Sequence, residues 1–183
     1  MKQNTEMINK IKNAIAVEYQ LPGVSTLTED NIDCNGNHFR MNVEIRSNKG
    51  LSFYVCRFDT QKDLFPYFQN KTGYKQNCDY IVFAENDICL YVFLVELKNT
   101  NVSPEKQLKI SKPFAEFLVS RIEAVVGKSA KKVDYKMIGI KERAQFKRPT
   151  GIEKLYAFNN DGYLLLPRND YMDLDFIITV NNL

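Results

Sequence analysis

The most informative stretch of this sequence is Cys78–Lys98, which reads CDYIVFAENDICLYVFLVELK. Two runs rich in β-branched and aromatic residues flank a short polar break, a pattern that predicts a β-hairpin. Asn86-Asp87 is the simplest turn, because both residue types tolerate the positive φ angles of tight hairpins. This turn predicts a register in which Asp79 lies opposite Leu94.

The register places three charged groups on one face of the hairpin. Side chains alternate along a strand, so Glu96 and Lys98 are expected on the same face as Asp79, at the open end of an otherwise apolar hairpin. A slip of one residue would turn Glu96 and Lys98 to the other face. The inference therefore depends on the turn.

These residue types suit a metal site. The carboxylates of Asp79 and Glu96 supply oxygen ligands for a hard divalent cation, and the Leu97 carbonyl adds another. Lys98 would neutralise charge on a phosphate or polarise an attacking water. The alternative is a solvated strand end, since Glu-x-Lys is a common tripeptide. The aspartate on the preceding strand, and the abrupt end of the apolar run at Glu96, favour the site.

Asp79, followed by Glu96-Leu97-Lys98 at the end of the next strand and then by a helix, resembles the PD-(D/E)xK nuclease superfamily. The resemblance covers the larger, N-terminal part of the chain, and no proline precedes Asp79 as it does in many members. It implies an α/β fold with a restriction-endonuclease-like core: a helix, three strands, a second helix and a further strand. We expect a central mixed β-sheet flanked by helices, with a C-terminal β extension, in a single domain over residues 1–183.

The resemblance also implies an activity. The chain would be a Mg²⁺-dependent endonuclease, with Mn²⁺ as a substitute, that hydrolyses phosphodiester bonds in DNA with Asp79, Glu96 and Lys98 as catalytic residues. Small nucleases of this kind belong to restriction or phage-defence systems, which is family association and not residue chemistry. Target recognition would come from a homodimer or from a partner protein.

Two other interpretations remain open. One is a catalytically inactive nuclease-fold protein that acts as a nucleic-acid- or protein-binding module. The other is an unrelated α+β interaction module in which Glu96-Leu97-Lys98 is accidental.

Composition narrows the classes of site. The chain has 183 residues, a formal net charge of +3 and one histidine, His38. A single histidine excludes His-rich zinc sites, and neither a Gly-rich phosphate loop nor a GxSxG motif is present. Four cysteines without C-x-x-C spacing, and no apolar run of membrane-spanning length, favour a cytoplasmic protein with reduced thiols and no membrane partner.

Two further residues are candidates for the site. Residues 5–20 are expected to form a helix, and Glu18 continues its apolar stripe, where a carboxylate needs a partner such as a metal cluster. The first helix of the resembled family often contributes such a glutamate; the alternative is that the helix frays and Glu18 reaches water. Gln107 lies on the helix after the motif, where some such nucleases place a supporting glutamine and where an exposed glutamine is also ordinary.

Residues 128–148 carry eight basic side chains against Asp134 and Glu142, a local net charge of +6. Basic residues at this density suit phosphate contacts, although a solvated charged edge is the alternative. The residues expected to bind nucleic acid are Lys141, Arg143, Lys147 and Arg148.

Weaker signals describe the rest of the chain. Polar residues 24–37 are expected to form a loop, and residues 39–45, 51–58 and 133–140 to form strands. The aromatic segment 60–77 either stacks bases or, as we favour, packs onto the sheet. Pro113 is expected to interrupt a helix that begins at Ser103-Pro104, with residues 114–125 continuing as a second segment. The C-terminal end is expected to form a hairpin, residues 153–159 with 163–167, followed by a strand over 173–180.

Overall fold

The structure is a computed structural model, and it describes residues 6–32, 36, 38–59, 64–71, 73–98, 103–141, 158–159, 162–167 and 171–180. Three α-helices are assigned in this part of the chain: α1 (Glu6–Ala14), α2 (Glu105–Val126) and α3 (Leu174–Val180). A 3₁₀ helix, η1, covers Val17–Tyr19. The strands are β1 (Gln20–Leu21), β2 (Thr26–Ile32), β3 (His38–Arg46), β4 (Ser52–Cys56), β5 (Tyr80–Glu85), β6 (Cys89–Lys98), β7 (Lys132–Lys141), β8 (Tyr163–Pro167) and β9 (Tyr171–Asp173).

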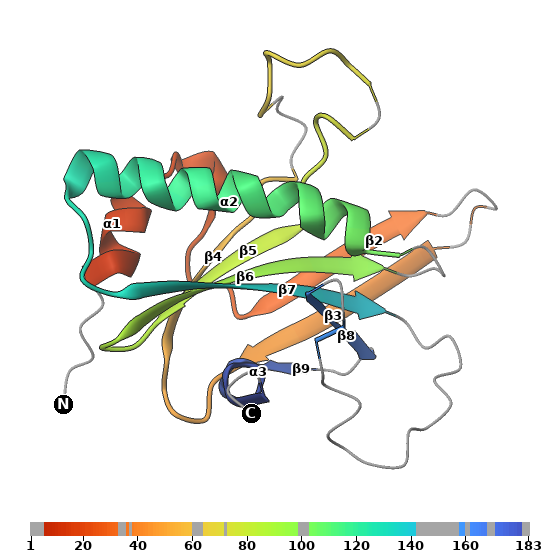
Figure 1. The fold of residues 1–183 in the computed structure, drawn as a ribbon. Helices are drawn as coiled ribbons and strands as arrows, with labels where there is room; N and C mark the ends of the chain where they lie inside the picture. The colour runs from red at the N-terminus through yellow and green to blue at the C-terminus, as the bar shows by residue number, and fades with distance from the viewer. Residues whose placement is uncertain are drawn as a thin grey trace.

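The described strands form two sheets. The larger is mixed and has the order β1-β4-β5-β6-β7-β8, in which β4, β5 and β6 are antiparallel and β6, β7 and β8 are parallel. The smaller has the order β2-β3-β9. Figure 1 shows α2 lying along one face of the larger sheet, while the smaller sheet and α3 lie on its other side. The expected α/β class with a mixed central sheet is confirmed.

The hairpin β5–β6 lies at the centre of both cores. Every residue of β5 is buried, and β6 is buried apart from Tyr91 and Lys98. Its alternate residues divide between two apolar clusters, so that Phe83 and Leu94 pack with α1 and α2 while Val82 and Phe93 pack with the smaller sheet and α3. Continuous apolar sequence in this stretch therefore reflects burial of both strand faces.

The hairpin turn lies one residue later than the sequence predicted. Asn86 N–H donates to the Cys89 carbonyl (3.1 Å), and the Asn86 side chain accepts from Ile88 N–H (2.9 Å), so Asp87-Ile88 forms the turn. The side chain of Asn86 organises the turn as an Asx cap. Ile81, not Asp79, is the partner of Leu94. Because moving the turn by one residue shifts each pairing by two, every side chain keeps its predicted face.

Helix α2 runs through Pro113 without interruption, contrary to the prediction. Proline removes one N–H donor to the preceding turn. Pro113 is exposed, so the carbonyl that lacks this donor lies on the outer side of the helix. Two large apolar residues of this helix, Phe117 and Val125, are 61% and 71% exposed. The residues that α2 buries are Leu108, Ser111, Ala115, Val119 and Ile122.

Two other predictions are corrected. Residues 26–32, expected in a loop, form β2 and pair with β3 along their whole length. Only Leu27 and Glu29 of β2 are buried. The other residues of the strand are mostly polar, so its sequence resembles that of a loop. Residues 174–180 form α3 instead of extending the strand, because Asp173 Oδ1 accepts Phe176 N–H (3.0 Å) as a helix cap. The C-terminal part is therefore not entirely β.

The described elements α1, β4, β5, β6, α2 and β7 follow one another in the order helix, three antiparallel strands, helix and strand, with β1, β2 and β3 between α1 and β4. The connection from β6 through α2 to β7 is a crossover between parallel neighbours. Within the described residues, no helix is both long enough and apolar enough to cross a membrane.

Candidate active site

Asp79 and Glu96 lie together at the open end of the β5–β6 hairpin. The antiparallel register that pairs Tyr80 with Val95 also brings the backbones of Asp79 and Glu96 opposite each other. Asp79 N–H donates to Glu96 Oε2 (3.2 Å), and Leu97 N–H donates to Asp79 Oδ2 (2.7 Å). Both carboxylates are buried, Glu96 completely. The corrected register thus brings the two acids closer than the predicted one did.

Lys98 follows Glu96 on the same face and is the cation nearest to it. Its ammonium forms an ion pair with Glu96 Oε1. The lysine side chain is 21% exposed, whereas its partner is fully buried. The ammonium therefore joins a buried acid to the solvent-facing side of the site. The structure brings Asp79, Glu96 and Lys98 together, as the alternation of side chains predicted.

Burial perturbs both carboxylic acids in the same direction. Burial, followed by the neighbouring Glu96 carboxylate, raises the pKa of Asp79 above its ordinary value. Burial also raises the pKa of Glu96, although the Lys98 ammonium opposes this. Two acids that resist ionisation side by side are typical of functional sites, where stability is secondary to chemistry.

Sequence reading missed a third buried carboxylate. Glu29 on β2 is buried, and its Oε2 accepts no hydrogen bond from the described residues and lies 4.0 Å from the Arg57 guanidinium. Burial raises the pKa of Glu29, and its charge in turn raises that of Asp79. The only signal in the sequence is the spacing of Leu27 and Glu29, which share the inward face of a strand read as a loop.

Arg57 and Tyr80 attach this acid to the hairpin. The Arg57 guanidinium lies over the Tyr80 ring, 5.3 Å from its centroid. The Tyr80 hydroxyl donates to the Thr28 carbonyl (2.6 Å) and accepts Thr28 N–H (3.1 Å). The smaller sheet is therefore fixed to β5 one residue away from Asp79. Asp59, exposed after β4, adds a further negative charge that raises the pKa of both Glu29 and Glu96.

The first turns of α2 border the same end of the sheet. Gly139 on β7 is the register partner of Glu96, and a Cβ added to it would lie 2.4 Å from Pro104 Cγ. Only glycine allows this approach. Ser111 Oγ accepts Cys78 N–H (2.6 Å) and donates to the Gln107 carbonyl (2.7 Å). The residue before Asp79 is thus held by α2.

Glu18 and Gln107 have different surroundings from those predicted. Helix α1 ends at Ala14, and Glu18 lies exposed on η1, so it does not continue the apolar stripe of α1. The prediction that Glu18 belongs to an extended first helix is wrong, and its role as a metal ligand has no support from burial. Gln107 is half-buried on the turn of α2 that holds Cys78, and its backbone carbonyl accepts a hydrogen bond from the Ser111 hydroxyl.

The basic segment is not a single patch. Within its described part, residues 128–141, Lys131 and Lys136 form internal ion pairs with Glu85 (2.6 Å) and Asp134 (2.8 Å). Strand β7 separates Lys132 from Lys141. Lys132 is the register partner of Cys89 at the closed end of the hairpin, and Lys141 is the register partner of Lys98 at the open end. Lys141 alone of the predicted contacts is placed beside the site; Arg143, Lys147 and Arg148 lie outside the described residues.

The donor set suits a hard cation only in part. Asp79, Glu96 and the Leu97 carbonyl are oxygen ligands of the kind that Mg²⁺ takes with additional waters. Among the described residues, however, no group of three or more acidic, histidine or cysteine side chains is close enough to hold a metal ion. The two carboxylates fit a magnesium site in which water and substrate complete the coordination.

Comparisons of the chain with protein-family models, with curated proteins and with solved structures gave no match.

Proposed function

We propose that this chain is a metal-dependent DNA endonuclease that hydrolyses phosphodiester bonds, with Asp79, Glu96 and Lys98 as its catalytic residues. The observation that carries the proposal is the meeting of two buried carboxylates and one partly exposed ammonium at the end of a strand pair. The sequence of elements α1, β4, β5, β6, α2 and β7 also supports it, since a restriction-endonuclease-like core has this order.

Asp79, Glu96 and the Leu97 carbonyl would hold Mg²⁺, or Mn²⁺ in its place. A bound divalent cation supplies Lewis-acid charge at the phosphate and lowers the pKa of a coordinated water. Both acids must be deprotonated to serve as ligands, so their raised pKa values make the site more competent as pH rises.

Lys98 would stabilise the charge that develops during hydrolysis. Its ammonium is held by Glu96 at the edge of the buried site and is partly exposed, so a phosphate oxygen can approach it from solvent. Lys141, the register partner of Lys98 on β7, would extend the positive charge along the backbone of the bound strand.

Plasmid nicking with Mg²⁺, with Mn²⁺ and with EDTA tests the proposal. The parent should nick supercoiled DNA with either metal and not in EDTA, and Glu96→Gln should not nick it under any of these conditions. Asp87→Asn is the matched control, because Asp87 is an exposed acid in the turn at the other end of the same hairpin. Metal-independent cleavage, or equal cleavage by Glu96→Gln and Asp87→Asn, would show that the site is misassigned.

A second function is an inactive nuclease-fold module that binds nucleic acid or protein. Two observations favour it: Lys98 already neutralises Glu96, and the described residues offer no third metal-binding side chain near the pair. This module would bind oligonucleotides without cutting them and would be indifferent to Mg²⁺. Titration of a labelled oligonucleotide with and without Mg²⁺, followed by electrophoresis of the same samples, separates the two functions.

A further inference from the structure

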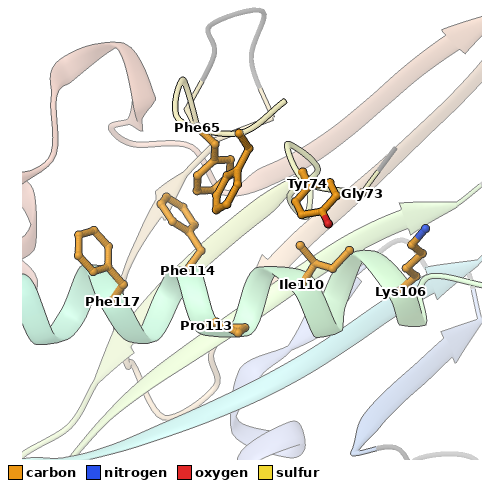
Figure 2. A pocket seen from close by; sticks show the side chains of 9 residues that line it. Phe65, Gly73, Tyr74, Lys106, Ile110, Pro113, Phe114 and Phe117 are labelled. Atoms are coloured by element: carbon orange, nitrogen blue, oxygen red, sulfur yellow. The ribbon is translucent and has the colours of Figure 1, made fainter. Parts of the chain in front are cut away.

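A groove with aromatic walls lies between the outer side of α2 and the segment 64–75. We call it the aromatic groove and define it by Phe65, Phe68, Tyr74, Lys106, Phe114 and Phe117. Its volume is about 600 Å³, within the range of small-molecule sites. Figure 1 shows the segment standing over the face of α2 that is turned away from the sheet, and Figure 2 shows the side chains that line the groove.

The inner rings of the groove are fixed by packing. Phe114 meets Phe65 and Phe58 edge to face, with ring centroids 5.2 Å apart in each pair. Phe65 in turn lies 6.2 Å from Phe68. These rings of the segment pack against Phe114 of α2, whereas the sequence predicted packing onto the sheet. This packing places rigid rings at the base of the groove, where a bound ring system would find them already ordered.

The outer rings face solvent. Phe117 is 61% exposed, Tyr74 is 56% exposed and Phe68 is 48% exposed. Phe68 and Tyr74 lie 5.7 Å apart and tilted, with part of each ring open to solvent. Exposed aromatic rings gathered on one surface are characteristic of binding sites.

The charge around the groove is positive. Lys106 is the one charged residue among those that line it, and a Cβ added to Gly73 would lie 3.5 Å from Lys106 Cε, so the lysine stem forms part of the wall. A smaller hollow of about 240 Å³ adjoins the groove through Phe68 and Tyr74, and its one charged lining residue is Lys71. Among the residues that the structure describes, no carboxylate lines either hollow. Aromatic faces flanked by lysines complement bases joined by phosphates.

The chain that lines the groove leads into the candidate active site. Tyr74 precedes Asp79 on the same connection, which α2 holds through the Ser111–Cys78 hydrogen bond (2.6 Å). Lys106 and Ile110 of the groove lie on the turns of α2 that flank Ser111.

We propose that the aromatic groove binds the unpaired bases of single-stranded DNA, and so directs cleavage to DNA that has a single-stranded segment. The bases would stack on Phe68, Tyr74 and Phe117, and Lys71 and Lys106 would contact phosphates. Stacking on these rings requires an open base face, which a paired duplex does not offer in its interior. The cleavage of the bound strand rests on the proposed nuclease function, whereas the binding of its bases in the groove does not.

The test measures binding in EDTA, where no cleavage occurs. A single-stranded oligonucleotide that contains 2-aminopurine, and the duplex of the same sequence, are titrated with the full chain. The parent should bind the single strand more tightly than the duplex and should change the fluorescence of 2-aminopurine. Tyr74→Leu, which removes a ring but keeps an apolar side chain, should weaken single-strand binding about tenfold and leave duplex binding unchanged. Phe68→Leu should act in the same direction.

Matched controls exclude general effects of the substitutions. Tyr171→Leu removes a ring of similar exposure (45%) on the smaller sheet, and Lys49→Gln removes an exposed lysine from a distant turn for comparison with Lys106→Gln. The controls should bind like the parent, and urea unfolding should show that all variants fold. Equal effects of Tyr74→Leu and Tyr171→Leu, equal affinity for single strand and duplex, or self-association that depends on Tyr74 would each overturn the proposal.

The two proposals fail in different ways. If the parent cleaves DNA with Mg²⁺ but Tyr74→Leu retains full single-strand affinity, the groove proposal is wrong and the nuclease proposal stands. If single-strand binding depends on Tyr74 but no metal supports cleavage, the groove proposal stands and the nuclease proposal is wrong.

Discussion

Two glutamates occupy opposite ends of the β5–β6 hairpin, and both are completely buried beside a lysine. Glu85, at the closed end, accepts the N–H groups of Met7 (3.2 Å) and Ile8 (3.0 Å) and the ammonium of Lys131 (2.6 Å). Glu96, at the open end, accepts Asp79 N–H and pairs with Lys98. Glu85 and Glu96 are thus equally buried and each pairs with a lysine, but their other neighbours differ.

The difference lies in the second acid. All the partners recorded for Glu85 are donors, and two of them belong to the first turn of α1, whose positive end favours a carboxylate. Glu96 lies beside Asp79 on the neighbouring strand, and Glu29 and Asp59 add further negative charge nearby. Burial alone therefore does not mark a functional carboxylate. The second acid beside Glu96, which burial also keeps from ionising freely, is what supports the proposed role of Glu96.

Cleavage should separate the two glutamates most strongly. Glu96→Gln and Lys98→Met should each lower the nicking rate by about 10³-fold, because the first removes a proposed metal-binding carboxylate and the second removes the ammonium that would stabilise charge on the phosphate. Glu85→Gln should nick at the parental rate wherever it is folded. Initial rates on supercoiled plasmid, measured at a temperature at which circular dichroism shows all three variants folded, give the comparison. Equal losses in Glu85→Gln and Glu96→Gln would remove the distinction between the two ends.

Stability should separate them in the opposite sense. Glu85→Ala removes the buried ion pair with Lys131 and removes the acceptor of two N–H groups of α1, so the free energy of unfolding should fall by about 3 kcal/mol. Urea unfolding of the parent, Glu85→Ala and the exposed control Asp87→Ala measures this. A loss in Glu85→Ala no larger than that in Asp87→Ala would contradict the structural role of Glu85.

Metal should stabilise only a chain with an intact open end. At a Mn²⁺ concentration about 100 times its dissociation constant, mass action raises the free energy of unfolding by about 2.7 kcal/mol. The parent and Glu85→Gln should both gain this stability, whereas Asp79→Asn should gain little. Thermal melts with and without Mn²⁺ report the shift. A gain in Asp79→Asn equal to that of the parent would place the metal elsewhere.

The comparison also shows why the sequence revealed one end of the hairpin and not the other. Asp79, Glu96 and Lys98 were found because alternation on adjacent strands survives a turn that is misplaced by one residue. Glu85 carried no such signal, since its partners Met7 and Lys131 come from distant parts of the chain and meet it only in three dimensions. Local periodicity predicts faces, but it does not predict which distant donor reaches a buried acid.

The elements that were misread share a physical cause. Residues 26–32 are polar because β2 buries only one narrow face, and residues 174–180 are rich in β-branched side chains although Asp173 caps a helix there. In both segments tertiary contacts override intrinsic preference. Glu29, the buried acid whose charge acts on Asp79, was missed together with β2. The apolar strands β5 and β6 were predictable because burial of both faces leaves a continuous apolar sequence.

The smallest expected effect is the pH dependence of stability in the absence of metal. Folding raises the pKa to about 8 for Asp79 and to about 7 for Glu96, in each case mainly through burial, so the folded chain holds these protons more tightly than the unfolded chain does. A raised carboxyl pKa contributes stability that is complete below the unfolded value and is lost as pH rises through the folded value. In EDTA, the parent should therefore lose stability between about pH 5 and pH 8.

Asp79→Asn removes one of the two acids while its amide oxygen can still accept Leu97 N–H. The variant should therefore be more stable than the parent by about 1 kcal/mol at pH 8, and the two stabilities should approach each other at pH 5. Glu29, Asp59, Arg57 and Lys98 are present in both proteins, so the two proteins differ only in the side chain at position 79. Urea unfolding of the pair at both pH values decides the point, because a stability difference that does not change with pH would mean that the two carboxylates ionise independently at the open end, as separate surface acids do.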